Sequence, residues 1–166
     1  MDTKPDSPIY AERLSSLRTQ ALFLGLTLLF GALFAWRVST VGFDTLGVIS
    51  LCFSVIFLFY TLNYRTLLIR ITPQSLKLQF GIFSWTEKLD NMASCNIDEL
   101  PWLLKYGGAG IHFMTAHERY RASFNFLEYS RVVLALKRKR GLVRDLSFST
   151  RQPEQVIQAL HGGSAG

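Results

Sequence analysis

Residues 21–36 read ALFLGLTLLFGALFAW, and residues 45–64 read TLGVISLCFSVIFLFYTLNY. Neither run contains a charged residue, and the uncharged stretch around the first one extends from Thr19 to Trp36. At a rise of about 1.5 Å per residue, a helix over 19–36 is about 27 Å long, close to the ~30 Å hydrocarbon thickness of a bilayer. Two such runs in succession predict a transmembrane helical hairpin over residues 19–64, with helices at about 19–36 and 45–64.

Two other interpretations of the apolar runs are weaker. A secretory signal peptide needs a small-x-small cleavage site after a short apolar core. Here the first run ends in Phe34-Ala35-Trp36-Arg37, and a second full-length run follows. A helical hairpin buried in a soluble core carries an apolar stripe, whereas both runs are apolar all round. The sequence thus indicates a membrane location more clearly than a molecular function.

The charges that flank the hairpin indicate its orientation. Cations lie before the first run and after the second, at Lys4, Arg13, Arg18, Arg65 and Arg70. The connecting loop, residues 37–44, has one cation and one acid. Because cytoplasmic flanks carry the excess of Lys and Arg, we expect both termini in the cytoplasm. Trp36 and Tyr64 fall at the predicted interfaces, where aromatic belt residues are common.

Small residues gather on one side of each predicted helix. Membrane helices associate through such sides because their backbones approach closely and hydroxyl groups bond across. We expect the two helices to pack together through them, and a helix of a partner subunit is the alternative occupant. The residues are Ala21, Gly25, Ala32 and Ala35 on the first helix, and Gly47, Ser50, Ser54 and Thr61 on the second.

Strand periodicity begins directly after the second apolar run, without a linker. Leu76, Leu78 and Phe80 alternate with polar residues, and the turn at residues 72–75 (TPQS) separates them from an alternating segment at 67–71. This pattern is typical of an antiparallel β-hairpin with one buried face. Further alternating segments lie at residues 83–89, 111–113, 120–126, 132–136 and 146–148.

A helix is expected from Pro153, a residue favoured at the first helical position, to Gly162. About seven short strands followed by this helix predict a mainly-β domain over residues 65–162, a small sandwich or barrel that the helix caps. We expect the rest of the chain to be irregular: a mobile cytoplasmic tail at 1–18 that becomes helical near Tyr10, an irregular stretch at 90–106 and a disordered tail at 163–166.

Three segments carry a resemblance to a known family. They are Ile71-Thr72-Pro73-Gln74-Ser75-Leu76 before a strand ended by Gly81, the glycine-rich Tyr106-Gly107-Gly108-Ala109-Gly110-Ile111, and Leu146-Ser147-Phe148-Ser149-Thr150 before Pro153-Glu154. Over residues 20–161 the chain resembles the bacterial membrane proteins that carry a pleckstrin-homology-like (PH-like) domain behind two transmembrane helices. The resemblance implies a seven-stranded barrel capped by the last helix and no enzymatic activity. We expect a location in the bacterial inner (cytoplasmic) membrane and no cofactor. The turn at 72–75 has no charge, so the resemblance does not extend to a phosphoinositide pocket.

The strongest charge run is Lys137-Arg138-Lys139-Arg140, which we expect in a hairpin turn. Cations near an anionic membrane surface contribute about 1 kcal/mol each, so this run is a candidate contact for lipid headgroups or for a protein partner. A solvated turn without a ligand is the other interpretation. The net charge of +6 suits a position beside an anionic leaflet and does not by itself indicate nucleic acid.

Other candidate sites are weaker. Arg119 and Arg121 alternate with aromatic residues, but alternate residues of a strand face opposite sides, so we expect an aromatic core and solvent-exposed arginines, not a nucleic-acid platform. The three histidines have no metal-ligand spacing with Cys95 or with one another. No nucleophile–base motif or facing pair of acids is recognisable. We therefore expect a non-enzymatic membrane protein that presents an interaction or assembly module, and an anionic-lipid sensor is the alternative.

Overall fold

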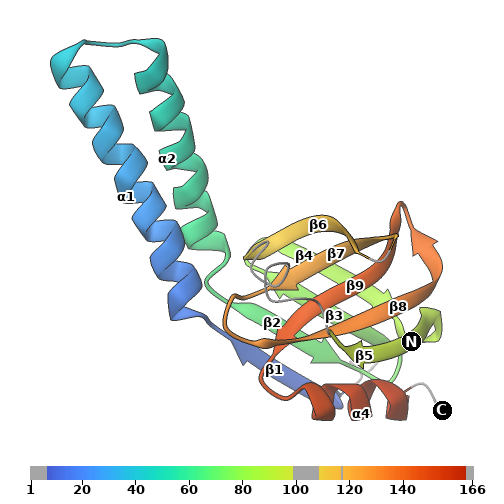
Figure 1. The fold of residues 1–166 in the computed structure, drawn as a ribbon. Coiled ribbons are helices and arrows are strands. Elements are labelled where there is room, and N and C mark those ends of the chain that lie inside the picture. Colours follow the sequence, from blue (N-terminus) through green and yellow to red (C-terminus); the bar gives the residue numbers. More distant parts are fainter. Residues whose placement is uncertain (1–6, 99–108, 117, 164–166) are drawn as a thin grey trace, which may run out of the picture.

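The computed structural model describes residues 7–98, 109–116 and 118–163. In these ranges a helical hairpin projects from a domain of two sheets and a C-terminal helix, which we call the sheet domain (Figure 1). The elements in chain order are β1 (Tyr10–Leu14), α1 (Leu17–Thr40), α2 (Thr45–Asn63), β2 (Leu67–Ile71), β3 (Ser75–Phe80), β4 (Phe83–Lys88), a 3-10 turn η1 (Leu89–Asn91), β5 (Met92–Ile97), β6 (Gly110–Ala116), β7 (Arg119–Asn125), β8 (Ser130–Arg140), β9 (Val143–Thr150) and α4 (Pro153–Gly163).

Helices α1 and α2 are long and apolar enough to span a membrane, as the sequence predicts. Large apolar side chains are exposed along both, whereas the core helices of a soluble fold are mostly buried. Side-chain caps start each helix: Ser16 Oγ accepts from Thr19 N at 3.0 Å, and Asp44 Oδ1 accepts from Gly47 N at 2.9 Å. Arg37, in the last turn of α1, pairs with Asp44, the N-cap of α2, and lowers the pKa of that carboxyl group.

Two sheets form the sheet domain. Strands β1-β2-β3-β4 make an antiparallel sheet, and β5-β8-β9-β7-β6 make a mixed sheet in which β7 and β9 are parallel. Alternating apolar side chains of both sheets fill the core, and the Phe80 and Phe126 rings meet edge to face with centroids 5.1 Å apart. Phe124 and Leu134, expected in the core, are buried there. Helix α4 packs against β5 and β8 and buries Val156 and Leu160.

The strand count differs from the prediction. The described residues form nine strands where about seven were expected, and the PH-like fold is not confirmed. Strands β2, β3, β4 and helix α4 lie where the sequence predicts them. Strand β5, in contrast, occupies part of the stretch 90–106 that we expected to be irregular. A register shift between Met92 and Ser94 puts the buried Met92 and Cys95 three residues apart, which hides the alternation. Residues 99–108 and 164–166 lie outside the described ranges.

Residues Tyr10–Leu14 form strand β1, so the expectation that the chain turns helical near Tyr10 is wrong. Strand β1 pairs antiparallel with β2 over its whole length, and Leu14 is fully buried. Glu12 joins this strand to the end of β9, because its carboxylate accepts from Thr150 Oγ1 at 2.6 Å and from Arg151 N at 3.0 Å. Tyr10 donates to the same carboxylate, and burial together with this bond raises the pKa of Tyr10 to about 12. Tertiary pairing overrides any local helical preference here.

Tyr64 joins the helical hairpin to the core. The sequence places it at a water interface, but its side chain is buried because β2 follows α2 without a linker. Its ring lies 6.0 Å from that of Phe23 on α1 and 5.4 Å from that of Phe80 on β3, between centroids. Gly110 has a φ of +85°, and a Cβ there would lie 2.4 Å from the Tyr64 ring. The base of the hairpin is therefore packed into the sheet domain.

Replacing Leu14 by Ala tests whether β1 belongs to the domain. Removing a fully buried leucine side chain should lower the free energy of unfolding by about 2–5 kcal/mol. Ile9→Ala is the matched control, since Ile9 is half exposed and precedes the strand. Thermal unfolding of the full chain in detergent checks both variants. Equal melting temperatures for the two variants would mean that the N-terminal segment is a tail.

Two glycine substitutions test the contact with Tyr64. Gly110 and Gly141 both have positive φ, but a Cβ at Gly141 meets open space. Gly141→Ala should therefore cost only the backbone strain of about 1–2 kcal/mol. Gly110→Ala should cost clearly more, because the Tyr64 ring must move as well. Unfolding of both variants in detergent measures the difference, and equal losses would argue against close packing of Tyr64 on β6.

Candidate functional site

The predicted basic run forms the end of strand β8. Lys137, Arg138, Lys139 and Arg140 are all exposed and are the last four residues of the strand. The turn that we expected at residues 139–141 begins only at Gly141, whose φ is +62°. The four residues therefore lie at the end of a strand and not at a loop tip. We call them the basic strand end.

The 3-10 turn η1 holds the backbone of the basic strand end. Arg138 N donates to Asn91 Oδ1 at 2.8 Å, and Asn91 Nδ2 donates to Arg138 O at 3.0 Å. Lys137 Nζ donates to Asp90 O at 2.9 Å. This clamp fixes the backbone from which the cations project. A fixed set of cations loses less conformational entropy on binding than a set on a mobile loop.

Arg140 differs from the other three cations. Its guanidinium group lies over the Trp85 ring, 4.7 Å from the centroid, and 3.8 Å from the Glu87 carboxylate. It also donates to Thr86 O. Arg140 is therefore occupied by β4. Among the described residues, no acid pairs with Lys137, Arg138 or Lys139, so these three carry the charge that is available to a ligand.

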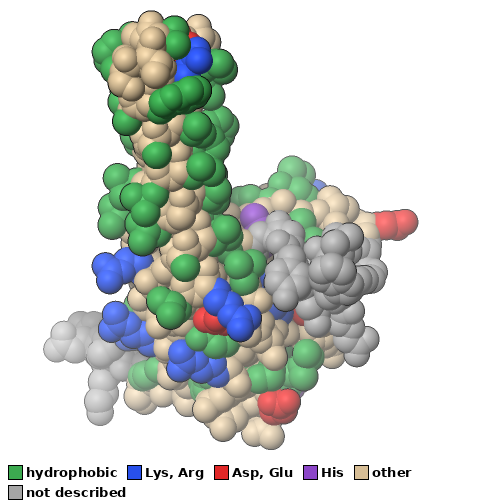
Figure 2. Space-filling model, turned by 60° about the vertical axis from the view of Figure 1, so that its left-hand side comes forward, with side chains coloured by type: hydrophobic (Ala, Val, Ile, Leu, Met, Phe, Trp, Pro, Cys, Tyr) green, Lys and Arg blue, Asp and Glu red, His purple; other side chains and the backbone are tan. Residues whose placement is uncertain are grey.

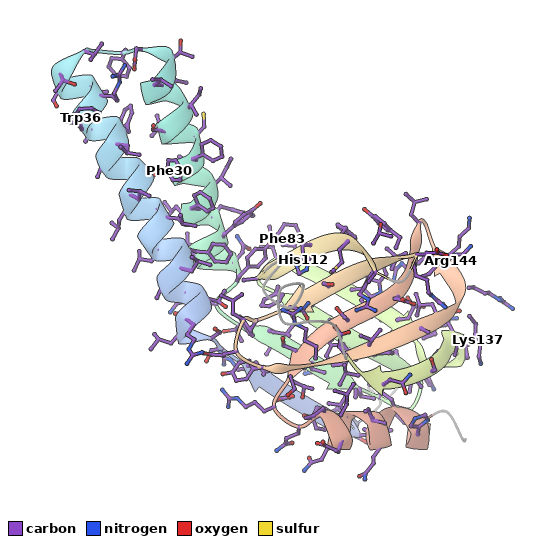
Figure 3. The ribbon with its side chains drawn as sticks, in the orientation of Figure 1. Phe30, Trp36, Phe83, His112, Lys137 and Arg144 are labelled. Carbon is purple, nitrogen blue, oxygen red and sulfur yellow. The ribbon has the colours of Figure 1, made fainter. Side chains whose placement is uncertain are left out.

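The basic strand end borders an open hollow of about 580 Å³. Its lining holds five cations and two acids, which leaves an excess of positive charge: Lys88, Lys137, Arg138, Lys139 and Arg140 against Glu87 and Asp90. Figure 3 places Lys137 on the side of the sheet domain away from the helical hairpin. The hollow suits an acidic partner that approaches from that side.

A buried charge cluster lies just after β5 and on β7 and β9, and the sequence pattern does not predict it. We expected Arg119 and Arg121 in solvent, but Arg121 is buried. Its Nη1 donates to both carboxylate oxygens of Asp98 at 3.2 Å, and its Nη2 lies 3.9 Å from the Asp145 carboxylate. Arg119 Nε is 2.8 Å from the same Asp145 group. Strand β7 lies inside the mixed sheet, and from Arg121 to Asn125 both of its faces are buried.

The geometry of this cluster indicates a structural role. Asp145 lies beside Arg119 and Arg121, Asp98 lies beside Arg121, and a third buried arginine, Arg131, is close enough to interact with Asp98 and Arg121. Nearby, Ser147 Oγ and Ser123 Oγ are hydrogen-bonded at 2.9 Å, and burial lowers the pKa of His112, which leaves its imidazole neutral at pH 7. Among the described residues no group of acids, histidines and cysteines is arranged to hold a metal ion. Each acid of the cluster is paired with at least one arginine, which supports a structural role.

Only α2 packs through part of the face that the sequence predicts, and α1 uses a different face. On α2, Gly47 is buried and Ser54 Oγ donates to Thr27 O of α1 at 3.0 Å. On α1 the contact runs instead through Phe23, Thr27, Phe30 and Gly31, with the Phe30 and Phe57 rings 5.6 Å apart between centroids. Aromatic side chains thus decide which side of α1 faces α2.

The other small residues lie elsewhere. The hydroxyls of Ser50 and Thr61 donate to carbonyl groups of α2 itself, at 2.9 and 2.8 Å. On α1 the small side is exposed and faces away from α2, at Ala21, Gly25, Ala32 and Ala35. Their use against a helix of a partner subunit, the alternative above, stays a prediction.

Comparison with protein-family models, with curated proteins and with solved structures gives no match to this chain. The interpretation of the basic strand end and of the buried cluster therefore follows from their own geometry.

Arg121→Met tests the structural role of the buried cluster. The substitution leaves the buried Asp98 carboxylate without its partner, which should lower the free energy of unfolding by about 3–5 kcal/mol. Arg144→Met is the matched control, because Arg144 is an exposed arginine on neighbouring β9 and should lose less than about 0.5 kcal/mol. Thermal unfolding in detergent distinguishes them. A normal melting curve for Arg121→Met would show that the cluster is not needed for folding.

Proposed function

We propose that this chain is an integral membrane protein whose helical hairpin crosses the bilayer and whose sheet domain is a non-enzymatic interaction or assembly module on the cytoplasmic face. The observation that carries the proposal is the pairing of β1 with β2. Strand β1 precedes α1 and β2 follows α2, so the start of α1 and the end of α2 are both joined to one sheet. The domain and both ends of the hairpin then lie on the same side of the membrane.

The distribution of charge supports the cytoplasmic side. Arg13 and Arg18 lie before or at the start of α1, and Arg65 and Arg70 follow α2. Figure 2 shows Lys and Arg side chains around the base of the hairpin. At the distant end of the hairpin the cation Arg37, in the last turn of α1, is paired with Asp44. Since cytoplasmic flanks carry the excess of cations, this asymmetry favours an inner-membrane protein with both termini in the cytoplasm.

We also propose a distant relationship to the bacterial membrane proteins with a PH-like domain. In its support, two apolar helices precede sheets and a C-terminal helix, and the turn at 72–75 joins β2 to β3. The departures are β1, which precedes the hairpin, and the parallel pairing of β7 with β9. The turn is closed on itself, with Thr72 N donating to Ser75 O at 2.8 Å, so it offers no basic pocket for a phosphoinositide.

The basic strand end is the proposed contact for a protein partner with an acidic surface. In Figure 3 Lys137 lies lower on the domain than Phe83 and Arg144, so a bilayer that begins at the end of α2 lies on the other side of the domain from it. Exposed charges interact weakly beyond about 8–10 Å at physiological salt. This placement favours a protein partner over the alternative, in which the same residues sense anionic lipid.

Reporter fusions test the topology. A reporter at the C-terminus and one at the N-terminus should both be active in the cytoplasm, because the β1–β2 pairing and the charge asymmetry put both ends there. A fusion in the loop at residue 42 is the control and should report the periplasm. A periplasmic signal from the C-terminal fusion would contradict the orientation, and opposite signals from the two ends would contradict the closed hairpin.

A photo-crosslinking residue in place of Lys139 distinguishes a protein partner from lipid. In native membranes we expect a covalent adduct between this chain and another protein, seen as a band of higher mass than the chain alone. The reason is that Lys139 lines the open hollow. The control carries the same residue at Gln158 on α4 and should give little of this adduct. Further replacement of Lys137 and Arg138 by Ser should reduce the adduct without lowering the melting temperature. Lipid adducts alone at position 139 would favour the lipid sensor instead.

A further inference from the structure

Large apolar side chains are exposed along the edge of the sheet domain that borders the hairpin. Ile82 and Leu142, at the β3–β4 and β8–β9 turns, are 74% and 73% exposed, and Phe113 on β6 is 53% exposed. Phe83 and Tyr120 are also exposed. We call these five residues the apolar edge. An exposed apolar patch of this kind marks a surface that is covered in the working protein.

The apolar edge is continuous. The Phe113 and Tyr120 rings stack with centroids 5.9 Å apart and planes at 5°. Both rings and Leu142 line one shallow hollow, and Phe113 and Phe83 line a second one beside Tyr64 at the base of the hairpin. The edge thus runs without a break from the end of α2 to the β8–β9 turn.

Direct contacts set the level of this edge relative to α2. The Phe83 ring meets the Phe59 ring edge to face, with centroids 6.1 Å apart. Ile82 N donates to Asn63 Oδ1 at 3.3 Å, and Asn63 is the last residue of α2. The β3–β4 turn therefore lies beside the last turn of the helix and not below it.

The length of α2 then fixes the depth of the edge. Its 19 residues span about 28 Å, barely the ~30 Å hydrocarbon thickness of a bilayer. A helix of this length crosses only if its last turn reaches the boundary between acyl chains and headgroups. Phe83, packed on that turn, must lie at the same boundary. Figure 2 shows hydrophobic side chains on the surface of the domain toward which the hairpin extends, and Figure 3 shows Phe83 next to the end of α2.

We infer that the apolar edge lies in the interfacial layer of the bilayer that α1 and α2 cross, so that the sheet domain rests on the membrane. The inference depends on the proposed insertion of the hairpin. Aromatic side chains, with one end apolar and a hydroxyl on Tyr120, suit this layer. The exposed Arg144 lies two residues after Leu142, where a cation attracts headgroups. Burial of Tyr64 at the base keeps the domain in this orientation.

Lipid-borne quenchers test this contact in the full chain. Cys52 is replaced by Ser, and Cys95 stays because burial raises the pKa of its thiol to about 12, which makes it unreactive to labelling. Single cysteines at Ile82 and at Leu142, both exposed, are labelled with an environment-sensitive fluorophore in phosphatidylcholine–phosphatidylglycerol nanodiscs. Two doxyl lipids act as quenchers in separate samples: one carries the doxyl group near the headgroup end of the acyl chain, for Ile82, Leu142 and Gln158, and one carries it near the chain end, at the depth of Leu28.

Two control positions make the outcomes distinguishable. Gln158→Cys lies on α4, at the opposite end of the domain, and Leu28→Cys lies within α1 (Figure 1). We expect strong quenching at Leu28 and quenching at Ile82 and Leu142 that is several-fold stronger than at Gln158.

Quenching at Leu28 alone would overturn the inference and leave the membrane anchor standing. A blue-shifted but unquenched label at Ile82 and Leu142 would mean that a protein covers the edge, which also overturns it. No quenching at Leu28 would overturn the proposed anchor, and the inference with it.

Discussion

The antiparallel pairing of β1 with β2 is the constraint on which the rest of the structure depends. These two strands are neighbours in the sheet but are separated along the chain by the whole helical hairpin. Closing so long a loop costs entropy, and the pairing is held by the buried Leu14 and by the bonds of Glu12 to the end of β9. The hairpin is thus an insertion in a sheet, and both of its ends belong to one folded body.

This closed base links the membrane location to the orientation of the domain. A domain on a flexible linker samples many orientations, whereas here Tyr64 is buried between α1, β3 and Gly110. The direction of the helices therefore determines which surfaces face the bilayer. By the proposed topology, the apolar edge faces the membrane and the basic strand end, from Lys137 to Lys139, faces a partner. The surface that contacts the membrane and the surface that contacts a partner are then on opposite sides of the sheet domain.

The sequence predicts what its long periodic patterns encode: the two apolar helices, the β2–β3 hairpin and α4. It fails where the structure depends on partners distant in the chain. Strand β1 is too short to show a period, and a register shift hides β5. The burial of Arg121 depends on the parallel pairing of β7 with β9, which puts Asp145 opposite it. One feature of the sequence could have indicated this pairing. The dipeptide Ser-Phe occurs at 123–124, beginning two residues after Arg121, and again at 147–148, beginning two residues after Asp145.

Disulfide trapping across β1 and β2 tests the closed base most directly. Ala11 and Arg70 are register partners with exposed side chains, so cysteines at both positions should form a disulfide when membranes with the Cys52→Ser chain are oxidised. Cysteines at Ala11 and Lys77, two strands apart, are the control and should not. A reducible shift in gel mobility for the first pair only is the predicted result. No disulfide between positions 11 and 70, or equal yields for both pairs, would contradict the account.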